Sequence, residues 1–366
     1  MLGGFGAGLA KLEQALIHHK TPTDNVQIVT TRGQVRLPAL LADTSDLYAF
    51  LNKRDLRRTD RYIQMALLAS YYALEDAVML TLKRRRMGII VATGYGSTCN
   101  TFDLLNRLED TSEALISPTE FSNSVHNAAA GQISIFLDEM GPNLTVSDHD
   151  MSIPSAFLTA VQWLQEERVD AVLLGGVDEY CQVLGHYWHS QYNDTAGDGN
   201  TVSIDTKRHA IIGEGACFFV LTREEEAAPR YGFIEDIQMG NFLRGRIRLP
   251  ENALFFIGAD GYSPCENYYA DIIPANAETA TYTPLYGGIP IGPAFDVAIA
   301  ALTVRSGTVR RPFKSGFGPD RLNMNSRDGS LDSERICCVK LGADGAFGSI
   351  VLNTGKLMNR CDTADR

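Results

Sequence analysis

The sequence lacks the features that would place it outside the ordinary globular proteins. No apolar run in its 366 residues approaches the roughly 18 that a membrane-spanning helix needs. It has no Cys-x-x-Cys spacing, and its seven cysteines stand singly apart from Cys337 and Cys338. The glycine-rich first ten residues lack the basic start of a secretory signal. These absences predict a cytoplasmic protein with reduced thiols, without a disulfide framework, a zinc site or a membrane contact.

An excess of positive charge is also missing. The chain has 33 Lys and Arg against 44 Asp and Glu, which gives a formal net charge of −11. Nucleic-acid binding needs a basic surface, so nucleic acid is not expected as a partner. Short basic runs at 83–86 and 244–248 are typical of solvated surface and do not change this.

What the sequence does contain is apolar patterning of two periods. A helix is predicted over 57–81, where apolar residues recur at helical spacing, and another over 293–305. Buried strands are predicted within 87–96, 169–179, 255–261 and 348–353. The Gly-Tyr-Gly-Ser within the first of these strands is interpreted as a strand-end turn, because no phosphate-loop motif follows it. Strands alternating with helices in a chain longer than one ordinary core predict an α/β layered fold with central mixed sheets.

One stretch places a strand directly before a helix. It begins at Gly141-Pro142, continues through the apolar residues 144–146 and a polar segment ending near Asp150, and leads into a helix predicted over 154–165. Backbone N–H groups and the positive end of the helix dipole meet at such a junction. It therefore suits an anionic nucleophile or an oxyanion, and it is the predicted centre of the site.

This stretch resembles the nucleophile loop of the β-ketoacyl synthases. In that family a Gly-Pro and an apolar strand lead to a cysteine, nine residues after the glycine and twenty-five before a Gly-Gly pair. Counting from Gly141 and from Gly175 leads to the same residue here, and it is Asp150. The resemblance implies that the nucleophile has been lost.

Other segments resemble the same family in the same order. Arg58-Thr-Asp-Arg-Tyr62 resembles its helix opening, 117–135 its Ser-Pro to Ala-Gly-x-Ile-Ser-Ile segment, and 212–221 its Gly-Glu-Gly-Ala strand. The likeness extends from about residue 57 to 352 and implies the duplicated αβαβα layered fold of the thiolase-like superfamily. The expected halves are residues 1–225 and 226–366, with dimerisation through the strand that carries Gly141 to Val146.

The catalytic set of the family is degenerate in this chain. Condensation there uses a thiolate and two histidines that stabilise the enolate and oxyanion, in a site organised by a lysine. The segment 259–264 stands where the first His motif belongs, although an alternative alignment uses Asn276, and 281–288 stands where the Lys and second His belong. The four degenerate positions, in chain order, are Asp150, Asp260, Thr283 and Gly288. No catalytic residue and no cofactor or metal is therefore expected.

A carboxylate in place of the nucleophile has a physical consequence. At a helix N-terminus Asp150 would be stabilised by backbone N–H groups and the dipole, and it would stay ionised. It would repel a malonyl carboxylate instead of recruiting it. Condensation by this chain alone is not expected.

A ketosynthase fold without its catalytic residues resembles the chain-length factor of type II polyketide synthases. In that family a silent homologue forms a heterodimer with an active ketosynthase, completes the polyketide tunnel and limits product length, with substrates delivered on an acyl carrier protein. The product here would be a polyketide or an aryl polyene. Chain-length factors usually carry Gln at the cysteine position, and Asp150 departs from that.

The resemblance also implies which residues line the tunnel and the interface. The segment from Glu120 to Ala128 follows the Ser-Pro motif that reaches across the dimer in the family. The tunnel and interface candidates are Glu120, Phe121, Ser124, Val125, Leu144 and Val146. A second interpretation is that these residues only pack the interface.

The alternative from another class is a stand-alone hydrolase, decarboxylase or acyltransferase. It would use Asp150, His149 and Asp260 as an acid–base cluster, or Cys265 as a displaced nucleophile just past Asp260. It requires His149 to face the pocket, and Cys265 has no histidine near it in sequence.

Overall fold

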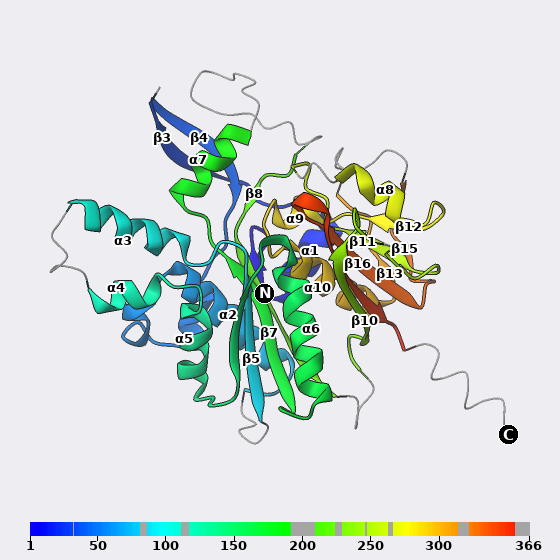
Figure 1. Cartoon of the computed structure of the whole chain (residues 1–366), viewed down its shortest axis with the longest axis horizontal. Helices are drawn as coiled ribbons and strands as arrows, with labels where there is room; N and C mark the ends of the chain where they lie inside the picture. The colour runs from blue at the N-terminus through cyan, green and yellow to red at the C-terminus, as the bar shows by residue number, and fades with distance from the viewer. Residues whose placement is uncertain are drawn as a thin grey trace.

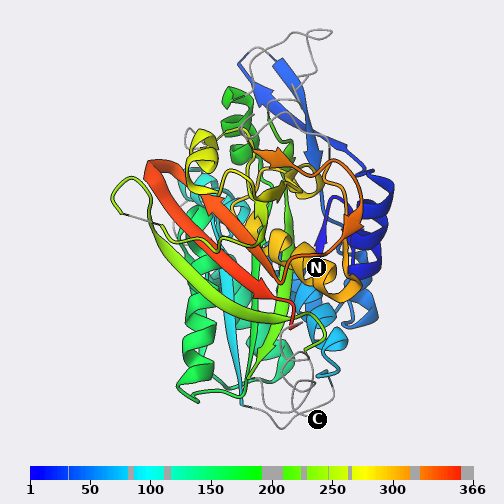
Figure 2. The ribbon, with the colours of Figure 1, turned by 90° about the vertical axis from the view of Figure 1, so that its right-hand side faces the viewer.

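The computed structural model of the chain describes residues 1–31, 33–80, 86–110, 117–191, 209–223, 229–245, 247–262, 266–313 and 322–355. Most strands of this part of the chain belong to two mixed sheets of six strands each (Figure 1). Figure 2 shows the second sheet in front of the first.

The first sheet is built from residues 2 to 222 in the order β2-β1-β9-β7-β5-β6. Its strands are β1 (Leu2–Gly3), β2 (Gly6–Ala7), β5 (Met87–Thr93), β6 (Asn143–Ser147), β7 (Ala171–Asp178) and β9 (Gly215–Thr222). β5 runs parallel to β6 and β7, and β9 is antiparallel to β7. β6 therefore lies at the edge of this sheet.

The second sheet is built from residues 233 to 353 in the order β10-β17-β16-β11-β12-β14. Its strands are β10 (Phe233–Asn241), β11 (Leu254–Ile257), β12 (Glu278–Ala280), β14 (Asn323–Met324), β16 (Arg335–Leu341) and β17 (Ala346–Asn353). Two small sheets complete the strands: β3 (Asp24–Thr30) with β4 (Gly33–Leu40) and β8 (Ile212–Gly213), and β13 (Thr308–Val309) with β15 (Gly329–Ser330).

The helices form layers on and between the sheets. They are α1 (Leu9–His18), α2 (Arg61–Asp76), α3 (Thr98–Asp110), α4 (Pro118–Asn123), α5 (Ala128–Leu137), α6 (Ser152–Gln165), α7 (Gln182–Gln191), α8 (Tyr269–Ile272), α9 (Thr283–Tyr286) and α10 (Gly292–Ser306). Short 3₁₀ helices are η1 (Ser45–Ala49), η2 (Asp55–Arg58), η4 (His149–Met151), η5 (Glu266–Tyr268) and η6 (Ala343–Gly345). Among the described helices, none is both long and apolar enough to cross a bilayer.

Alternating side chains of the buried strands define the layers. On β5, Ile89 and Val91 pack with α2 and α5, whereas Ile90 and Ala92 pack with α1, α6 and α10. That second cluster continues into the second sheet, whose opposite face packs with α8. The order is helices, sheet, helices, sheet, helices, so the predicted layered αβαβα fold is confirmed (Figure 1). The expected boundary between residues 225 and 226 lies outside the described residues; in sequence it falls after β9 of the first sheet and before β10 of the second.

Candidate functional site

The site lies where β6 passes into α6. The η4 turn joins them, and Ser152, the first residue of α6, fixes it: its Oγ accepts from the N–H of Asp148 at 2.7 Å and lies 2.9 Å from the carbonyl of Thr93 at the end of β5. His149 holds a φ of 44°, a left-handed conformation that is uncommon outside glycine. The turn brings Asp150 to the second sheet.

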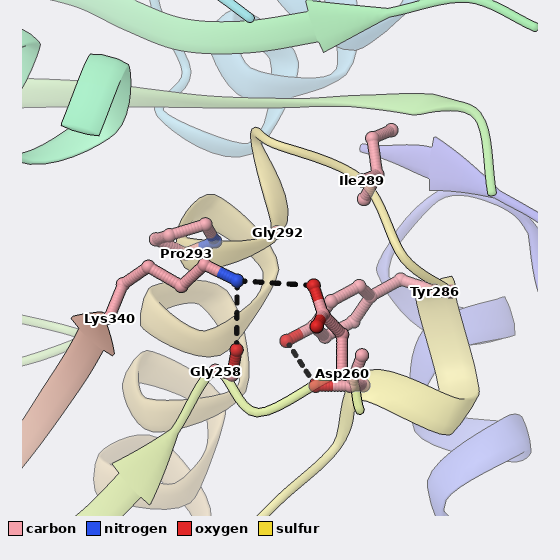
Figure 3. A pocket seen from close by; sticks show the side chains of 9 residues that line it. Gly258, Asp260, Tyr286, Ile289, Gly292, Pro293 and Lys340 are labelled. Atoms are coloured by element: carbon pink, nitrogen blue, oxygen red, sulfur yellow. Dashed lines mark hydrogen bonds and ion pairs between the residues drawn. The ribbon is translucent and has the colours of Figure 1, made fainter. Parts of the chain in front are cut away.

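A lysine from the second sheet meets this aspartate. Lys340, on β16, is a charged side chain in a wholly buried run and is itself only 5% exposed. Its Nζ lies 3.5 Å from Asp150 Oδ1 and 3.3 Å from Asp260 Oδ2, and it donates to the carbonyl of Gly258 at 3.0 Å. Figure 3 shows the lysine pointing at Asp260 and Gly258, which follow β11. Two of the degenerate positions are thus joined by a cation.

His149 contacts the same carboxylate from the solvent side. Its Nδ1 lies 3.3 Å from Asp150 Oδ2 although the side chain is 61% exposed, and its ring meets Tyr95 edge-on at 5.6 Å. Burial by itself would raise the pKa of Asp150, but Lys340 and His149 outweigh it and hold that pKa below its ordinary value. The hydrogen bond to Asp150 in turn raises the pKa of His149. The lowered pKa favours the ionised form of Asp150, but the side chains of Lys340 and His149 stabilise its charge, whereas the sequence suggested backbone N–H groups and the helix dipole.

Thr283 and Tyr286 of α9 line the inner wall of the pocket, and Figure 3 shows Tyr286 beside Asp260. Tyr286 donates to Asp296 Oδ1 of α10 at 2.8 Å, and its hydroxyl lies 3.3 Å from Thr283 Oγ1. Complete burial raises the pKa of Asp296 to about 7, although Tyr286 and Lys340 both act against that rise. Thr283, which stands where the family lysine belongs, is therefore engaged with neighbouring hydroxyls.

Two aromatic rings fill the space next to Gly288. A Cβ on this glycine would lie 3.1 Å from Trp188 Cη2 and 3.5 Å from Tyr262 Cε2. These two rings meet edge-on at 4.3 Å, and the Tyr262 hydroxyl donates to the carbonyl of Ala210 at 2.6 Å. A histidine at position 288 would have to displace this pair.

The arrangement leaves little room and little chemistry. The pocket around Lys340 leaves no room even for a water-sized molecule, whereas sites for small organic ligands usually hold roughly 300–1,000 Å³. Among the described residues no group of three or more His, Cys, Asp or Glu is placed to hold a metal ion. Burial raises the pKa of every described cysteine, among them Cys99 and Cys217 to about 12, so none of these is an activated thiolate.

Comparisons with known proteins agree with the layered fold. A family model described as "Beta-ketoacyl synthase, N-terminal domain" matches residues 13–227, more than half of the chain. The chain belongs to the β-ketoacyl synthase family. It is 24% identical over 254 residues to the 3-oxoacyl-[acyl-carrier-protein] synthase 2 of Vibrio cholerae, a match that covers 63% of this chain. That match spans 58% of the relative, so the chain spans less than two thirds of the curated ketosynthases it first matches.

Solved ketosynthases share the fold over nearly the whole chain. A β-ketoacyl synthase from Burkholderia phymatum superposes with a TM-score of 0.77 at 15% identity, covering 96% of this chain and 97% of that one. A ketosynthase in complex with its chain length factor from Xenorhabdus doucetiae gives 0.75 at 13% identity, covering 96% and 95%. At these identities the likeness establishes the fold alone.

The predicted site residues divide into a joined and a separate group. Asp150 and Asp260 meet at Lys340, Thr283 lines the same pocket, and Gly288 lies under the Trp188–Tyr262 pair. His149 contacts Asp150 from the solvent side. Cys265 lies outside the described residues.

The tunnel and interface candidates lie on the other side of the junction. Glu120 forms an ion pair with Arg107 of α3, and the carbonyl of Ser124 accepts from Thr101 Oγ1 at 2.8 Å. Phe121, Val125 and Leu144 are exposed, whereas Val146 packs against the central cluster. They surround the edge strand β6 and its neighbouring helices, and their role stays a prediction.

The sequence interpretation of this ketosynthase-family chain missed Lys340. It lies in the apolar run Cys337-Cys-Val-Lys-Leu341, which forms a buried strand. Lysine is almost never buried without an anionic partner. A lysine inside a predicted buried strand therefore indicates that a carboxylate contacts it in the fold.

Proposed function

We propose that this chain is a non-catalytic ketosynthase-like subunit, a chain-length factor, that pairs with an active ketosynthase in type II polyketide or aryl-polyene biosynthesis. The observation that carries the proposal is the ion pair of Asp150 with Lys340 at the position where the family places its nucleophile. An ionised carboxylate bound to an ammonium is a poor acyl acceptor, and the pocket provides no pair of histidines for an oxyanion.

The edge of the first sheet supports a partner chain. β6 pairs with β5 on one side, and the described part of the chain places no strand on its other side. Large apolar side chains are exposed on β6, on α5 that packs against it, on α4 and in the segments that follow the two helices: Phe121, Val125, Ile135, Met140 and Leu144. An open edge bordered by exposed apolar residues favours pairing with another chain. The partner we propose is an active ketosynthase, and its substrates would arrive on an acyl carrier protein.

The α4 segment supports the chain-length role. Glu120 and Phe121 lie on this short helix, and Ser124 and Val125 follow directly. The segment is tied to α3 by the Arg107–Glu120 ion pair and the Thr101–Ser124 hydrogen bond, while Phe121 and Val125 project outward. A polar and aromatic surface held on a fixed helix suits the floor of a tunnel for a polar poly-β-ketone. We propose a cytoplasmic location for the complex.

The contact between His149 and Asp150 favours the stand-alone hydrolase as second candidate. A 3.3 Å contact with an exposed histidine is ordinary geometry for an acid–base pair. However, Lys340 holds the same carboxylate, and no described cysteine is poised to attack. This candidate therefore depends on a water nucleophile and a substrate bound outside the filled pocket.

The test reconstitutes the chain with a candidate active ketosynthase, with malonyl-carrier protein as substrate. We expect polyketide from the pair and none from this chain alone. Asp150→Ala should leave output per assembled heterodimer within about twofold, because a residue without transition-state partners has little to stabilise. The matched control replaces the nucleophilic cysteine of the ketosynthase by alanine, which should abolish output. A loss of orders of magnitude in an intact Asp150→Ala heterodimer would establish Asp150 as catalytic.

A further inference from the structure

Three charged residues bring the two sheets together at the site. Asp150 belongs to the η4 turn beside the first sheet, whereas Lys340 lies on β16 and Asp260 follows β11 in the second. The ammonium lies within 3.5 Å of one carboxylate and 3.3 Å of the other. Asp150, Lys340 and Asp260 are called the ionic clamp below.

We propose that Lys340 is a positioning residue whose ammonium, in the ionic clamp, holds the η4 turn and the end of strand β6 against the second sheet. The inference concerns the single chain and stands whether or not the chain pairs with a ketosynthase. It assigns to the former catalytic pocket a mechanical task in place of a chemical one.

Burial removes each of these three charges from water, and the desolvation of an unpaired charge is strongly unfavourable. Lys340 is almost fully buried, and both carboxylates are largely so. Removing one partner from a buried ion pair leaves an uncompensated charge and is strongly destabilising. Without the ammonium, two buried carboxylates would face each other at the seam, and the turn that carries one of them would be driven outward.

The backbone around the turn fits this task. A Cβ on Gly342, just past Lys340, would lie 3.5 Å from Asp150 Cβ, so β16 approaches η4 closely. A Cβ on Gly348 of β17 would lie 2.5 Å from Pro154 and 3.2 Å from the sulfur of Met151. The turn and the first residues of α6 therefore rest directly on the second sheet. The clamp adds the charge attraction that keeps them there.

Charged and titratable groups of η4 itself and of four other elements surround the clamp. His149 of η4 and Tyr95 after β5 lie on its outer side, and Tyr286 of α9 and Asp296 of α10 on its inner side. Asp178 of β7 acts from the first sheet. The charge of Lys340 also acts to lower the pKa of Asp296, which accepts a hydrogen bond from Tyr286. The clamp is accordingly tested by removing its charges one at a time.

The experiment measures amide hydrogen exchange of residues 143–152 in the full chain at constant pH. The variants are Lys340→Met, which keeps the length of the side chain, and the triple variant Lys340→Met/Asp150→Asn/Asp260→Asn, which removes all three charges. The β3–β4 hairpin, Asp24–Leu40, lies in a separate small sheet and is the internal reference. In Lys340→Met we expect exchange of 143–152 to accelerate about tenfold or more while the hairpin keeps its rate.

A chemical rescue separates the ammonium from mere bulk. Lys340→Ala is measured with added propylammonium chloride, and with 1-propanol plus sodium chloride as the matched control. Slower exchange of 143–152 with propylammonium alone, together with near-normal exchange in the triple variant, supports the clamp. Unchanged exchange in Lys340→Met, equal acceleration in the hairpin, or equal rescue by propanol would each overturn it. If Lys340→Met does not fold, the triple variant must fold, and its failure also overturns the proposal.

Discussion

At the scale of single residues, buried carboxylates shape the described part of this chain. Asp178 at the end of β7 accepts from Thr93 Oγ1 at 2.6 Å and from the N–H groups of Gly94 and Tyr95 at 3.0 and 2.9 Å. It thereby fixes the Gly-Tyr-Gly segment as a strand-end turn, the interpretation that the sequence favoured. Burial nevertheless raises the pKa of Asp178 to about 6.

Two further carboxylates, Asp60 and Glu179, contact the start of α3. Asp60 caps α2 by accepting from the N–H of Ile63 at 2.8 Å and also accepts from Asn100, while Glu179 accepts from the N–H of Cys99 at 3.1 Å. Burial, with a contribution from the charge of Asp60, raises the pKa of Glu179 from 4.5 to about 8. Both acids hold the first turn of the same helix.

The raised pKa of Glu179 predicts how stability depends on pH. Between pH 4.5 and about 8 the folded chain keeps a proton that the unfolded chain has lost. The free energy of unfolding therefore falls as pH rises through this window. Glu179→Gln keeps the acceptor for Cys99 and removes the titration, so its stability should fall less, by a few kcal/mol at most, since one pKa unit is worth about 1.4 kcal/mol.

The measurement is urea unfolding of wild type and Glu179→Gln from pH 5 to pH 9. Glu167→Gln changes a side chain that is 77% exposed and serves as the matched control. Its curve should run parallel to that of the wild type. A Glu179→Gln curve that is also parallel would contradict the assignment.

The sequence indicated which catalytic residues are missing from the site, but it did not indicate the lysine that occupies the site. Counting between glycines located Asp150 because loop lengths are fixed on either side of a buried strand. Lys340 lies 190 residues further on, and its contact with Asp150 depends on how two sheets pack. The spacing of residues within one segment therefore could not identify Asp150 as a partner of Lys340.

At the scale of elements, the strongest periodic patterns gave the best predictions. The helix predicted over 154–165 is α6, Ser152–Gln165, and the strand predicted within 87–96 is β5, Met87–Thr93. Two quoted motifs also meet in space, since Arg61 of α2 pairs with Glu214 before β9. No sequence rule predicted that pairing, because it joins a helix to the start of a strand 153 residues further along the chain.

The α4 segment predicts a change in product length. Ser124→Trp should shorten the polyketide because it adds bulk beside the proposed tunnel floor, and Phe121→Ala should lengthen it by removing a ring that projects outward. Mass spectrometry of products from correctly assembled heterodimers measures both. Unchanged lengths in both variants would mean that the floor lies elsewhere.

The β6 edge predicts which substitution prevents pairing. Leu144 is 37% exposed on this strand, so Leu144→Lys should leave the fold intact and weaken association with the ketosynthase about tenfold or more. The control is Val29→Lys, which places the same charge on the exposed strand β3 of a separate sheet. Sedimentation of each variant with the partner decides the matter. A Leu144→Lys variant that pairs as tightly as wild type would rule out β6 as the contact.

At the scale of the whole molecule, the family likeness predicted the duplicated five-layer arrangement, which could not be predicted from composition and periodicity alone. Two six-stranded sheets that share one central layer of helices require contacts between residues 90 and 350, far beyond any local pattern. Composition and periodicity reached only an α/β layered chain with mixed sheets. The motif order supplied the duplication, and the structure supplied the seam between the sheets.

The exposed apolar side chains around β6 predict the behaviour of the isolated chain. Met140 is 93% exposed, Ile135 70% and Phe121 62%, beside an open sheet edge. Obligate interfaces resemble a protein core cut in half, so a chain with this surface should self-associate or precipitate when expressed alone and become soluble with its ketosynthase. Sedimentation velocity with and without the partner measures this. A stable monomer that ignores an added ketosynthase would remove the main physical reason for an obligate pair.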